Sequence, residues 1–261
     1  MRKITALAVA GTLAVVASMA FAAQTNTYTV EGNVTPVKVG TKAKPTPVEL
    51  FFGYTVAEVD GKRPALIDQY EIFFENGQTN AGLFPKCTAA SIDAAQSDSH
   101  CPKGSLMGTG IVQNKAGSST DETSQAVTCN LTLRLHNGGV EGKRQFFTLY
   151  LHGAPDPDPA KNCPLALDKA IKAEFVKKRN GTALVFKVDD TLLNPAPGFD
   201  NAVVNVESTV NKVTKKVKGK TRGFFESAGK CGTDKTSEIN VTFRQRNDGK
   251  KSTVKSTTKC A

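Results

Sequence analysis

The chain has 261 residues and a formal net charge of +10. Beyond residue 22 no segment is apolar enough to span a bilayer, which argues against a helical membrane protein. The positive charge is uneven, because residues 211–261 contain 14 Lys and Arg against 4 Asp and Glu, whereas residues 23–210 contain 18 and 20. The basic character therefore belongs to the last fifty or so residues.

The first residues have the pattern of a secretory signal. Arg2 and Lys3 precede an apolar run that begins at Ile4 and ends in small residues around Ala22. A membrane anchor would need about 20 apolar residues, and this run is shorter. We therefore expect residues 1–22 to be removed and residues 23–261 to be exported, either to the extracellular space or to the cell envelope.

Six cysteines follow this segment, an even number that predicts disulfides in an exported chain. We expect sequence neighbours to pair, although the spacing alone leaves other connectivities open. A structural zinc site needs close pairs such as Cys-x-x-Cys, and the chain has none. The residues are Cys87, Cys101, Cys129, Cys163, Cys231 and Cys260.

The first third of the chain predicts short strands. Residues 27–39 alternate apolar and polar side chains, with Gly32 and Pro36 between two expected strands. Residues 48–59 and 66–75 are rich in β-branched and aromatic side chains. They flank Asp60-Gly61, which is typical of a hairpin turn, so we expect these two strands to pair.

A disulfide loop is predicted next. Thr88 is a residue type that caps helices, and residues 88–95 are rich in alanine, which predicts a helix of about two turns. Cys101-Pro102 ends it. A bridge between Cys87 and Cys101 would close a loop too short to bury a core of its own. Gly108-Thr109-Gly110 then indicates a bulge or close strand packing rather than a phosphate site, because no lysine and helix follow.

This region resembles a group of uncharacterised secreted proteins of actinobacteria. The shared pattern is Pro-x-Cys, a spacer of helix length, and Cys-Pro-x-x-Ser-x-x-Gly-Thr-Gly. The ending is also similar, with Gly229-Lys230-Cys231, Asp248-Gly249 and Cys260. The group implies no activity that transfers to this chain. The residues that match the first pattern are Pro85, Cys87, Cys101, Pro102, Ser105, Gly108, Thr109 and Gly110.

The rest of the chain predicts more hairpins. Residues 114–124 are polar and predict a loop. Residues 129–136 and 146–152 alternate around a glycine-rich turn, and a turn centred near Val140 would pair Leu133 with Phe147. Residues 168–178 and 182–188 flank Asn180-Gly181, although the first of these segments could instead be a short helix. Residues 202–217 and 239–254 complete the pattern.

About twelve predicted strands and no internal repeat indicate an all-β fold, either an antiparallel sandwich or an open barrel. We expect residues 23–261 to form one domain, with a possible division near residues 160–168.

No catalytic or metal-binding residues are predicted. His136 and His152 lie near opposite ends of one expected hairpin, roughly 26 Å apart at about 3.3 Å per residue, so they cannot share a site. His100 is expected in solvent. Carboxylates at Asp156/Asp158, Asp189/Asp190 and Asp200 lack the density of an EF-hand, and turn formation explains them better than calcium. We expect no cofactor.

One basic stretch suggests a partner. In an exported protein it would meet anionic wall polymer or lipid headgroups rather than nucleic acid. The alternative is a solvated edge strand whose lysines prevent sheet-to-sheet pairing. The residues are Lys212, Lys215, Lys216, Lys218, Lys220 and Arg222.

The sequence thus predicts a non-enzymatic, disulfide-linked β-protein that serves as a binding or structural module at the cell surface. The second possibility is a carrier with an apolar cavity for a lipid or another small molecule, and the third is a hydrolase. A continuous cavity of several hundred cubic ångström would favour the carrier.

Overall fold

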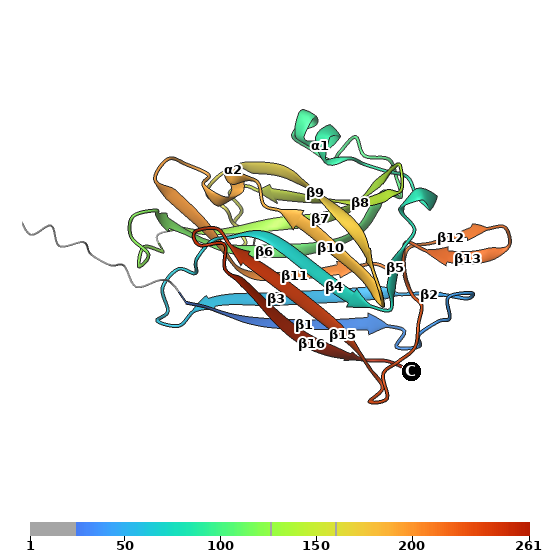
Figure 1. Cartoon of the computed structure of the whole chain (residues 1–261). Coiled ribbons are helices and arrows are strands. Elements are labelled where there is room, and N and C mark those ends of the chain that lie inside the picture. Colours follow the sequence, from blue (N-terminus) through green and yellow to red (C-terminus); the bar gives the residue numbers. More distant parts are fainter. Residues whose placement is uncertain (1–24, 126, 160) are drawn as a thin grey trace, which may run out of the picture.

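The computed structural model describes residues 25–125, 127–159 and 161–261. Strands dominate it, and the prediction of an all-β fold is confirmed. Most strands join one antiparallel sheet of eleven strands that curls into a nearly closed barrel (Figure 1). In sheet order these strands are β1 (Asn26–Thr35), β3 (Glu49–Glu58), β11 (Phe199–Val210), β6 (Leu106–Ser118), β7 (Val127–Glu141), β8 (Arg144–Gly153), β9 (Leu167–Lys178), β10 (Gly181–Lys187), β4 (Ile67–Glu75), β15 (Thr236–Gln245) and β16 (Lys251–Lys259).

Two small sheets and three short helices complete the described fold. One sheet contains β2 (Thr46–Pro47), β14 (Phe225–Ser227) and β5 (Gly77–Thr79), and the other pairs β12 (Thr214–Val217) with β13 (Lys220–Gly223). The helices are the 3₁₀-helix η1 (Ala81–Leu83), α1 (Ala89–Ala95) and α2 (Asp190–Leu193). No helix among the described residues is both long and apolar enough to cross a membrane.

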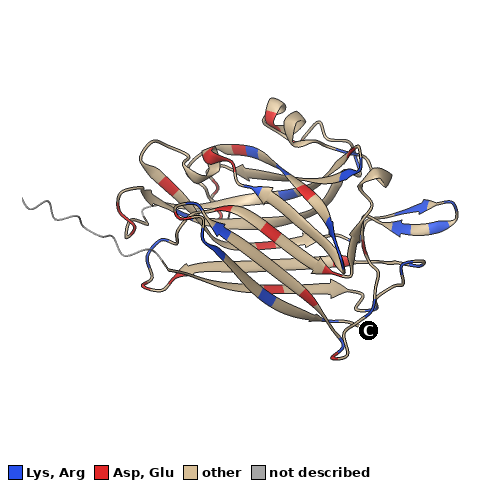
Figure 2. Ribbon diagram, viewed as in Figure 1, with Lys and Arg blue, Asp and Glu red and all other residues tan. Residues whose placement is uncertain are grey.

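Alternation of side chains explains why these segments form a barrel. In β15 every second residue is buried, including Ile239, Val241 and Phe243. The residues between them face outward, as the two-residue period of a strand requires. Figure 2 shows that charged residues of both signs are spread along the strands. The inner faces supply one continuous apolar core.

The barrel closes where its two edge strands, β1 and β16, lie beside each other (Figure 1). The end of the chain completes this seam, because Val39 N donates to Ala261 O and Ala261 N donates to Val37 O, both at 2.8 Å. Inside, Tyr28 of β1 stacks on Phe243 of β15 with ring centroids 4.4 Å apart. Backbone pairing and aromatic packing therefore hold the two edges together.

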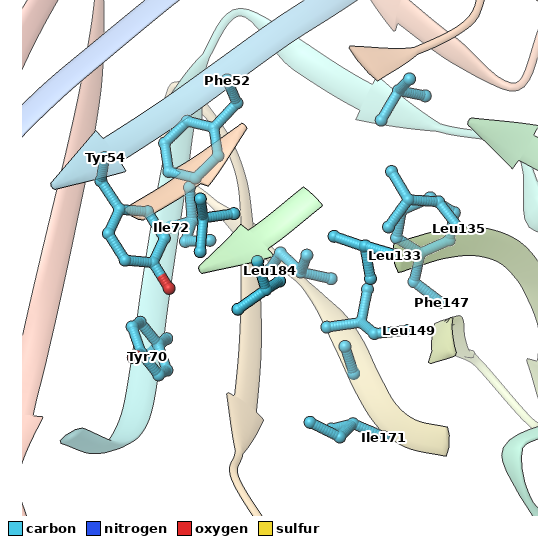
Figure 3. Packing of buried hydrophobic residues seen from close by; sticks show 14 of the residues in the cluster. Phe52, Tyr54, Tyr70, Ile72, Leu133, Leu135, Phe147, Leu149, Ile171 and Leu184 are labelled. Atoms are coloured by element: carbon cyan, nitrogen blue, oxygen red, sulfur yellow. The ribbon is translucent and has the colours of Figure 1, made fainter. Parts of the chain in front are cut away.

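Apolar side chains fill most of the barrel (Figure 3). Aromatic rings from β3 and β4 meet directly, with Phe52 and Phe74 5.8 Å apart and Tyr54 and Tyr70 5.6 Å apart between ring centroids. The two ends are also blocked. Leu192 and Leu193 of α2 close one end, and the neighbouring residues Phe224 and Phe225 close the other.

The predicted disulfides are confirmed. The bonds join Cys87 to Cys101, Cys129 to Cys163, and Cys231 to Cys260, and the described residues include no free cysteine. The predicted helix is confirmed as α1, whose N-cap Thr88 accepts a hydrogen bond from Ser91 N. Disulfides of this number are typical of proteins from an oxidising environment. The predicted signal, residues 1–22, lies outside the described residues.

The glycines in Gly108-Thr109-Gly110 allow close strand packing, as predicted. A Cβ atom added at Gly108 would lie 2.0 Å from Thr209 O, and one at Gly110 would lie 2.3 Å from Glu207 O. Any larger residue would push β6 away from β11, so these positions need glycine because the two backbones approach so closely.

The predicted pairing of residues 48–59 with residues 66–75 is wrong. Strand β3 pairs with β1 and β11, whereas β4 pairs with β10 and β15. The connection through Asp60-Gly61 instead crosses the barrel, and β3 and β4 meet through their inward side chains. A turn signal fixes where the chain reverses, but it does not fix which strand becomes the hydrogen-bonded partner.

Two local predictions also need correction. In the β7–β8 hairpin Leu133 pairs with Leu151 rather than Phe147, because the turn lies at residues 141–144 and a bulge follows Asn137. The expected loop at residues 114–124 begins as strand, since β6 continues to Ser118. Residues 168–178 form strand β9, which confirms the predicted hairpin strand rather than its alternative, a short helix. The hairpins at Asn180-Gly181 and Asp248-Gly249 are confirmed.

Strands on both sides of residues 160–168 lie in the same sheet, with β8 hydrogen-bonded to β9. The bond between Cys129 and Cys163 ties this connection to β7. The barrel wall is therefore continuous across the segment.

Candidate functional site

The predicted basic residues lie on or beside a β-ribbon that projects from one end of the barrel (Figure 1). Strands β12 and β13 pair only with each other, with Val217 opposite Lys220 at the tip. Lys218 and Gly219 form the turn, with φ of 49° and 76°. Positive φ at both central residues matches the twist of two-residue hairpins, which explains a tight ribbon at this position.

The ribbon carries a concentrated positive charge. Residues 211–223 contain six Lys or Arg and no Asp or Glu. In Figure 2 the charged residues of the ribbon are therefore all blue. Five lysines are exposed and form no ion pair with a described carboxylate, and four of them also make no side-chain hydrogen bond with a described residue: Lys212, Lys216, Lys218 and Lys220. The unpaired charges of these side chains are free to meet an anionic partner.

The other two predicted residues anchor the ribbon to the barrel. Lys215 Nζ donates a 3.1 Å hydrogen bond to Leu83 O. Arg222 binds Glu226 through two hydrogen bonds of 3.0 Å, and its Nη2 also donates to Asn80 Oδ1 at 2.9 Å. These contacts fix the base of the ribbon, although Lys215 itself is exposed.

Glu226 is the buried acceptor in this anchor, with no exposed surface. It also accepts hydrogen bonds from Gly223 N and Gln78 Nε2, both at 2.8 Å. Burial opposes its ionisation, but the hydrogen bonds from Arg222 and its other donors outweigh burial and lower the pKa of Glu226. The carboxylate is therefore charged at neutral pH and holds Arg222 in place.

A second group of polar side chains lies under the disulfide loop, and the sequence did not predict it. Ser105 Oγ is 3.2 Å from His136 Nδ1, and His136 Nε2 is 2.9 Å from Asp98 Oδ2. A carboxylate accepts only, so Nε2 carries the hydrogen. Burial lowers the pKa of His136 despite Asp98 nearby, so the ring is neutral and Nδ1 accepts from Ser105.

These three residue types can form a hydrolytic triad, but here they are packed away from solvent. Ser105 has no exposed surface, and His136 is 2% exposed. Arg134 also pairs with Asp98, with 2.8 Å between Arg134 Nε and Asp98 Oδ2. The arrangement joins the disulfide loop to the outer face of β7. No residue pattern predicts this group, because outward residues of a strand are normally in solvent.

His152 belongs to a separate hydrogen-bonded group, but the predicted placement of the two histidines at opposite ends of the hairpin is wrong, because His136 stands opposite Thr148, only four positions along β8 from His152. His152 Nδ1 lies 2.7 Å from Asp168 Oδ1, and Tyr150 Oη donates to the same oxygen at 2.5 Å. Tyr150 and His152 of β8 therefore share the Asp168 carboxylate of β9. His100 is exposed at the end of the disulfide loop.

The carboxylates considered for calcium bind other groups of the protein, either in turns or as ion pairs. Asp156 accepts from Asp158 N, and Asp189 caps α2 by accepting from Thr191 N. Asp200 lies 3.6 Å from Arg63, and Asp190 lies 3.2 Å from Arg246. Turn formation and ion pairing therefore account for them.

Only one group of three potential metal ligands occurs among the described residues: Cys87, His100 and Cys101. Its two sulfurs already form a disulfide.

No protein-family model matches this chain, and comparison with curated proteins and with solved structures finds no similar protein.

Proposed function

We propose that this protein is an exported, non-enzymatic binding module of the cell surface or envelope. Its β12–β13 ribbon contacts a polyanion whose negative groups are phosphates or carboxylates, as in wall polymer or anionic lipid headgroups. The four exposed lysines bind, while Lys215 and Arg222 hold the ribbon in position.

The observation that carries this proposal is the projection of unpaired positive charge away from the barrel. A two-stranded ribbon is only marginally stable by itself. Here ion pairs and hydrogen bonds fix its base, while its exposed residues add no buried apolar side chain to the core. The lysines do protect the ribbon edges from pairing, but edge protection does not require so many cations with no carboxylate near them.

The three disulfides and the predicted signal support export, where anionic surface polymers are abundant. Binding of this kind depends on long-range attraction between charges, so it weakens as salt screens the ribbon.

The test compares the wild-type protein with a variant in which Lys212, Lys216, Lys218 and Lys220 are replaced by Gln. Binding is measured by sedimentation with anionic phospholipid vesicles and with purified anionic wall polymer, at low and high salt. If each lysine contributes about 1 kcal/mol near an anionic surface, the variant loses about 100- to 1000-fold in affinity. The vesicle and polymer arms identify which polyanion is preferred.

The matched control replaces four other exposed lysines by Gln: Lys42, Lys250, Lys251 and Lys259. It has the same net charge as the ribbon variant and should keep wild-type binding. Equal losses in both variants would show that net charge alone drives association. Wild-type binding that is absent, or that does not change with salt, would contradict the proposal.

A further inference from the structure

The barrel interior contains an apolar cavity of about 110 Å³. Leucines of β7 and β8 form one wall, and aromatic residues of β3 and β4 form the opposite wall (Figure 3). Apolar cavities of about 150 Å³ lined by such residues stay dry and bind molecules of the size of benzene. The space is thus in the size class of a single ring.

Two buried polar atoms of the cavity lining make no hydrogen bond of normal geometry with a described residue, although the Tyr54 phenol lies close enough to Tyr70 to influence its pKa. The two atoms are Tyr70 Oη and Asn201 Oδ1, in residues that are only 1% and 4% exposed. Asn201 uses its other polar atom, Nδ2, to bind Leu192 O of α2. Buried polar groups are nearly always paired, so two unpaired ones on a single cavity indicate a missing partner.

The strand register places these groups toward the end closed by α2. Asn201 of β11 stands opposite Ala116, near the end of β6. Asn114 of β6 also lines the cavity, and it stands opposite Val203, two residues after Asn201 on β11. Tyr70 stands opposite Phe186, shortly before α2. The other end, at Phe224, is apolar. The cavity therefore has a polar end and an apolar end.

The available groups define the chemistry of a ligand. Burial raises the pKa of Tyr54 and of Tyr70, so both phenols remain protonated and can donate. Asn201 Oδ1 can only accept. A hydroxyl group both accepts and donates, so one ligand hydroxyl can pair either with Tyr70 or with Asn201.

We infer that the barrel binds a small neutral molecule, with one ring or a short chain and a single hydroxyl, whose hydroxyl lies at the polar end and pairs with Tyr70 or with Asn201. The site is separate from the ribbon and does not rest on the function proposed for it.

A route to this cavity is visible in the barrel wall. The β9–β10 ladder runs only from Gly181 to Val185, and beyond it β10 pairs with β4 alone. An outer groove of about 580 Å³ lies at this split. Ile171, Phe186 and Val188 line both the groove and the cavity. These three side chains are the partition between ligand and solvent.

Lys169 spans the polar side of this partition. Its Nζ lies 3.3 Å from Asp93 of α1 and 3.4 Å from Asp189 at the start of α2. It ties together two helices at the split, so its ion pairs oppose any widening between β9 and β10.

Binding is tested by calorimetry on the full disulfide-bonded protein, with phenol and with toluene, which replaces the hydroxyl by a methyl group. At least one of the variants Tyr70→Phe and Asn201→Ala should weaken phenol binding about 3- to 10-fold, the effect of one hydrogen bond, and neither should change toluene binding. Tyr28→Phe alters a tyrosine outside the cavity lining and should change neither ligand. Tyr70→Phe removes a single oxygen, so a folded variant is expected, and circular dichroism checks it.

Methyl resonances of Leu133 and Leu184 report occupancy directly, because both residues line the cavity. They should shift with phenol in the wild type. Lys169→Ala should speed phenol exchange at least threefold with little change in affinity. The inference is overturned if neither ligand shifts these resonances at millimolar concentration, or if Tyr70→Phe and Asn201→Ala weaken toluene as much as phenol.

Discussion

Ionisable side chains that lie inside this protein are held by specific partners. Arg63 is 2% exposed, and it donates to Ser124 O at 2.6 Å and to Ser118 O at 2.8 Å. Glu226 and His136 are similarly enclosed, each by hydrogen bonds from or to distant parts of the chain. An ionisable group in such a place stabilises the fold only in the charge state that its partners match.

Glu226→Gln tests this at the base of the ribbon. The change removes the charge that pairs with Arg222, and we expect a loss of about 1–3 kcal/mol in the free energy of unfolding at pH 7. The pKa of Glu226 is lower in the folded protein than its ordinary value of 4.5. Its contribution is therefore complete above pH 4.5 and is lost as pH falls through the folded-state pKa.

Urea unfolding at a series of pH values measures this effect. The wild type should lose stability on acidification below about pH 4.5 more steeply than Glu226→Gln. Glu49→Gln, at an exposed position, is the control and should behave as the wild type. Equal pH dependence in all three proteins would contradict the role given to Glu226.

His136 predicts a second pH effect in a different range. Burial lowers its pKa from the ordinary value of 6.5, so the unfolded chain takes up a proton first on acidification. Stability should be constant above pH 6.5 and should fall below it until the folded-state pKa is reached. His136→Asn should flatten the urea-unfolding profile below pH 6.5, whereas His100→Asn, which changes an exposed histidine, should leave the slope intact.

At the scale of elements, the disulfide loop illustrates what a sequence can and cannot predict. The cap at Thr88, the helix length and the bridge between Cys87 and Cys101 follow from local rules about residue types. The contact that anchors the loop does not follow from local rules, because Asp98 of the loop binds His136 of β7, 38 residues further along the chain. Pairing at such a separation depends on how the barrel folds, so the candidate Ser-His-Asp group was invisible from sequence.

Replacing Cys87 and Cys101 together by Ser should show how far these polar contacts hold the loop without the bond. The bridge spans 14 residues, which predicts a loss of about 3 kcal/mol in the free energy of unfolding. Amide exchange should rise in α1 and stay unchanged in β15, a strand that is not next to those on which α1 packs. A loss of exchange protection throughout the barrel would mean that the loop is part of the core.

At the scale of the whole molecule, the fold class could be predicted but the strand order could not. Alternation and turn residues identified most strands, and the hairpins at Asn180-Gly181 and Asp248-Gly249 are where expected. The order β1-β3-β11-β6 brings together segments up to about 150 residues apart. Residue patterns carry the period of a strand, but any inward apolar face can match several partners.

The seam between β1 and β16 predicts how the barrel fails. The last bridge, from Cys231 to Cys260, spans 29 residues and holds the chain end where it pairs with Val37 and Val39. Replacing both cysteines by Ser should lower the free energy of unfolding by about 3–4 kcal/mol. Limited proteolysis should then cut first near β16. First cleavage at the ribbon instead, in wild type and variant alike, would contradict this.

The projecting ribbon also has a consequence for how the chain can change. Because residues 216–221 place no side chain among the buried core residues and the anchors Lys215 and Arg222 lie outside this segment, the barrel does not depend on the identity or number of these six residues. A hairpin of another length or chemistry could be spliced between Lys215 and Arg222 while the scaffold keeps its shape. The same barrel could thus present different recognition segments, with specificity exchanged independently of folding.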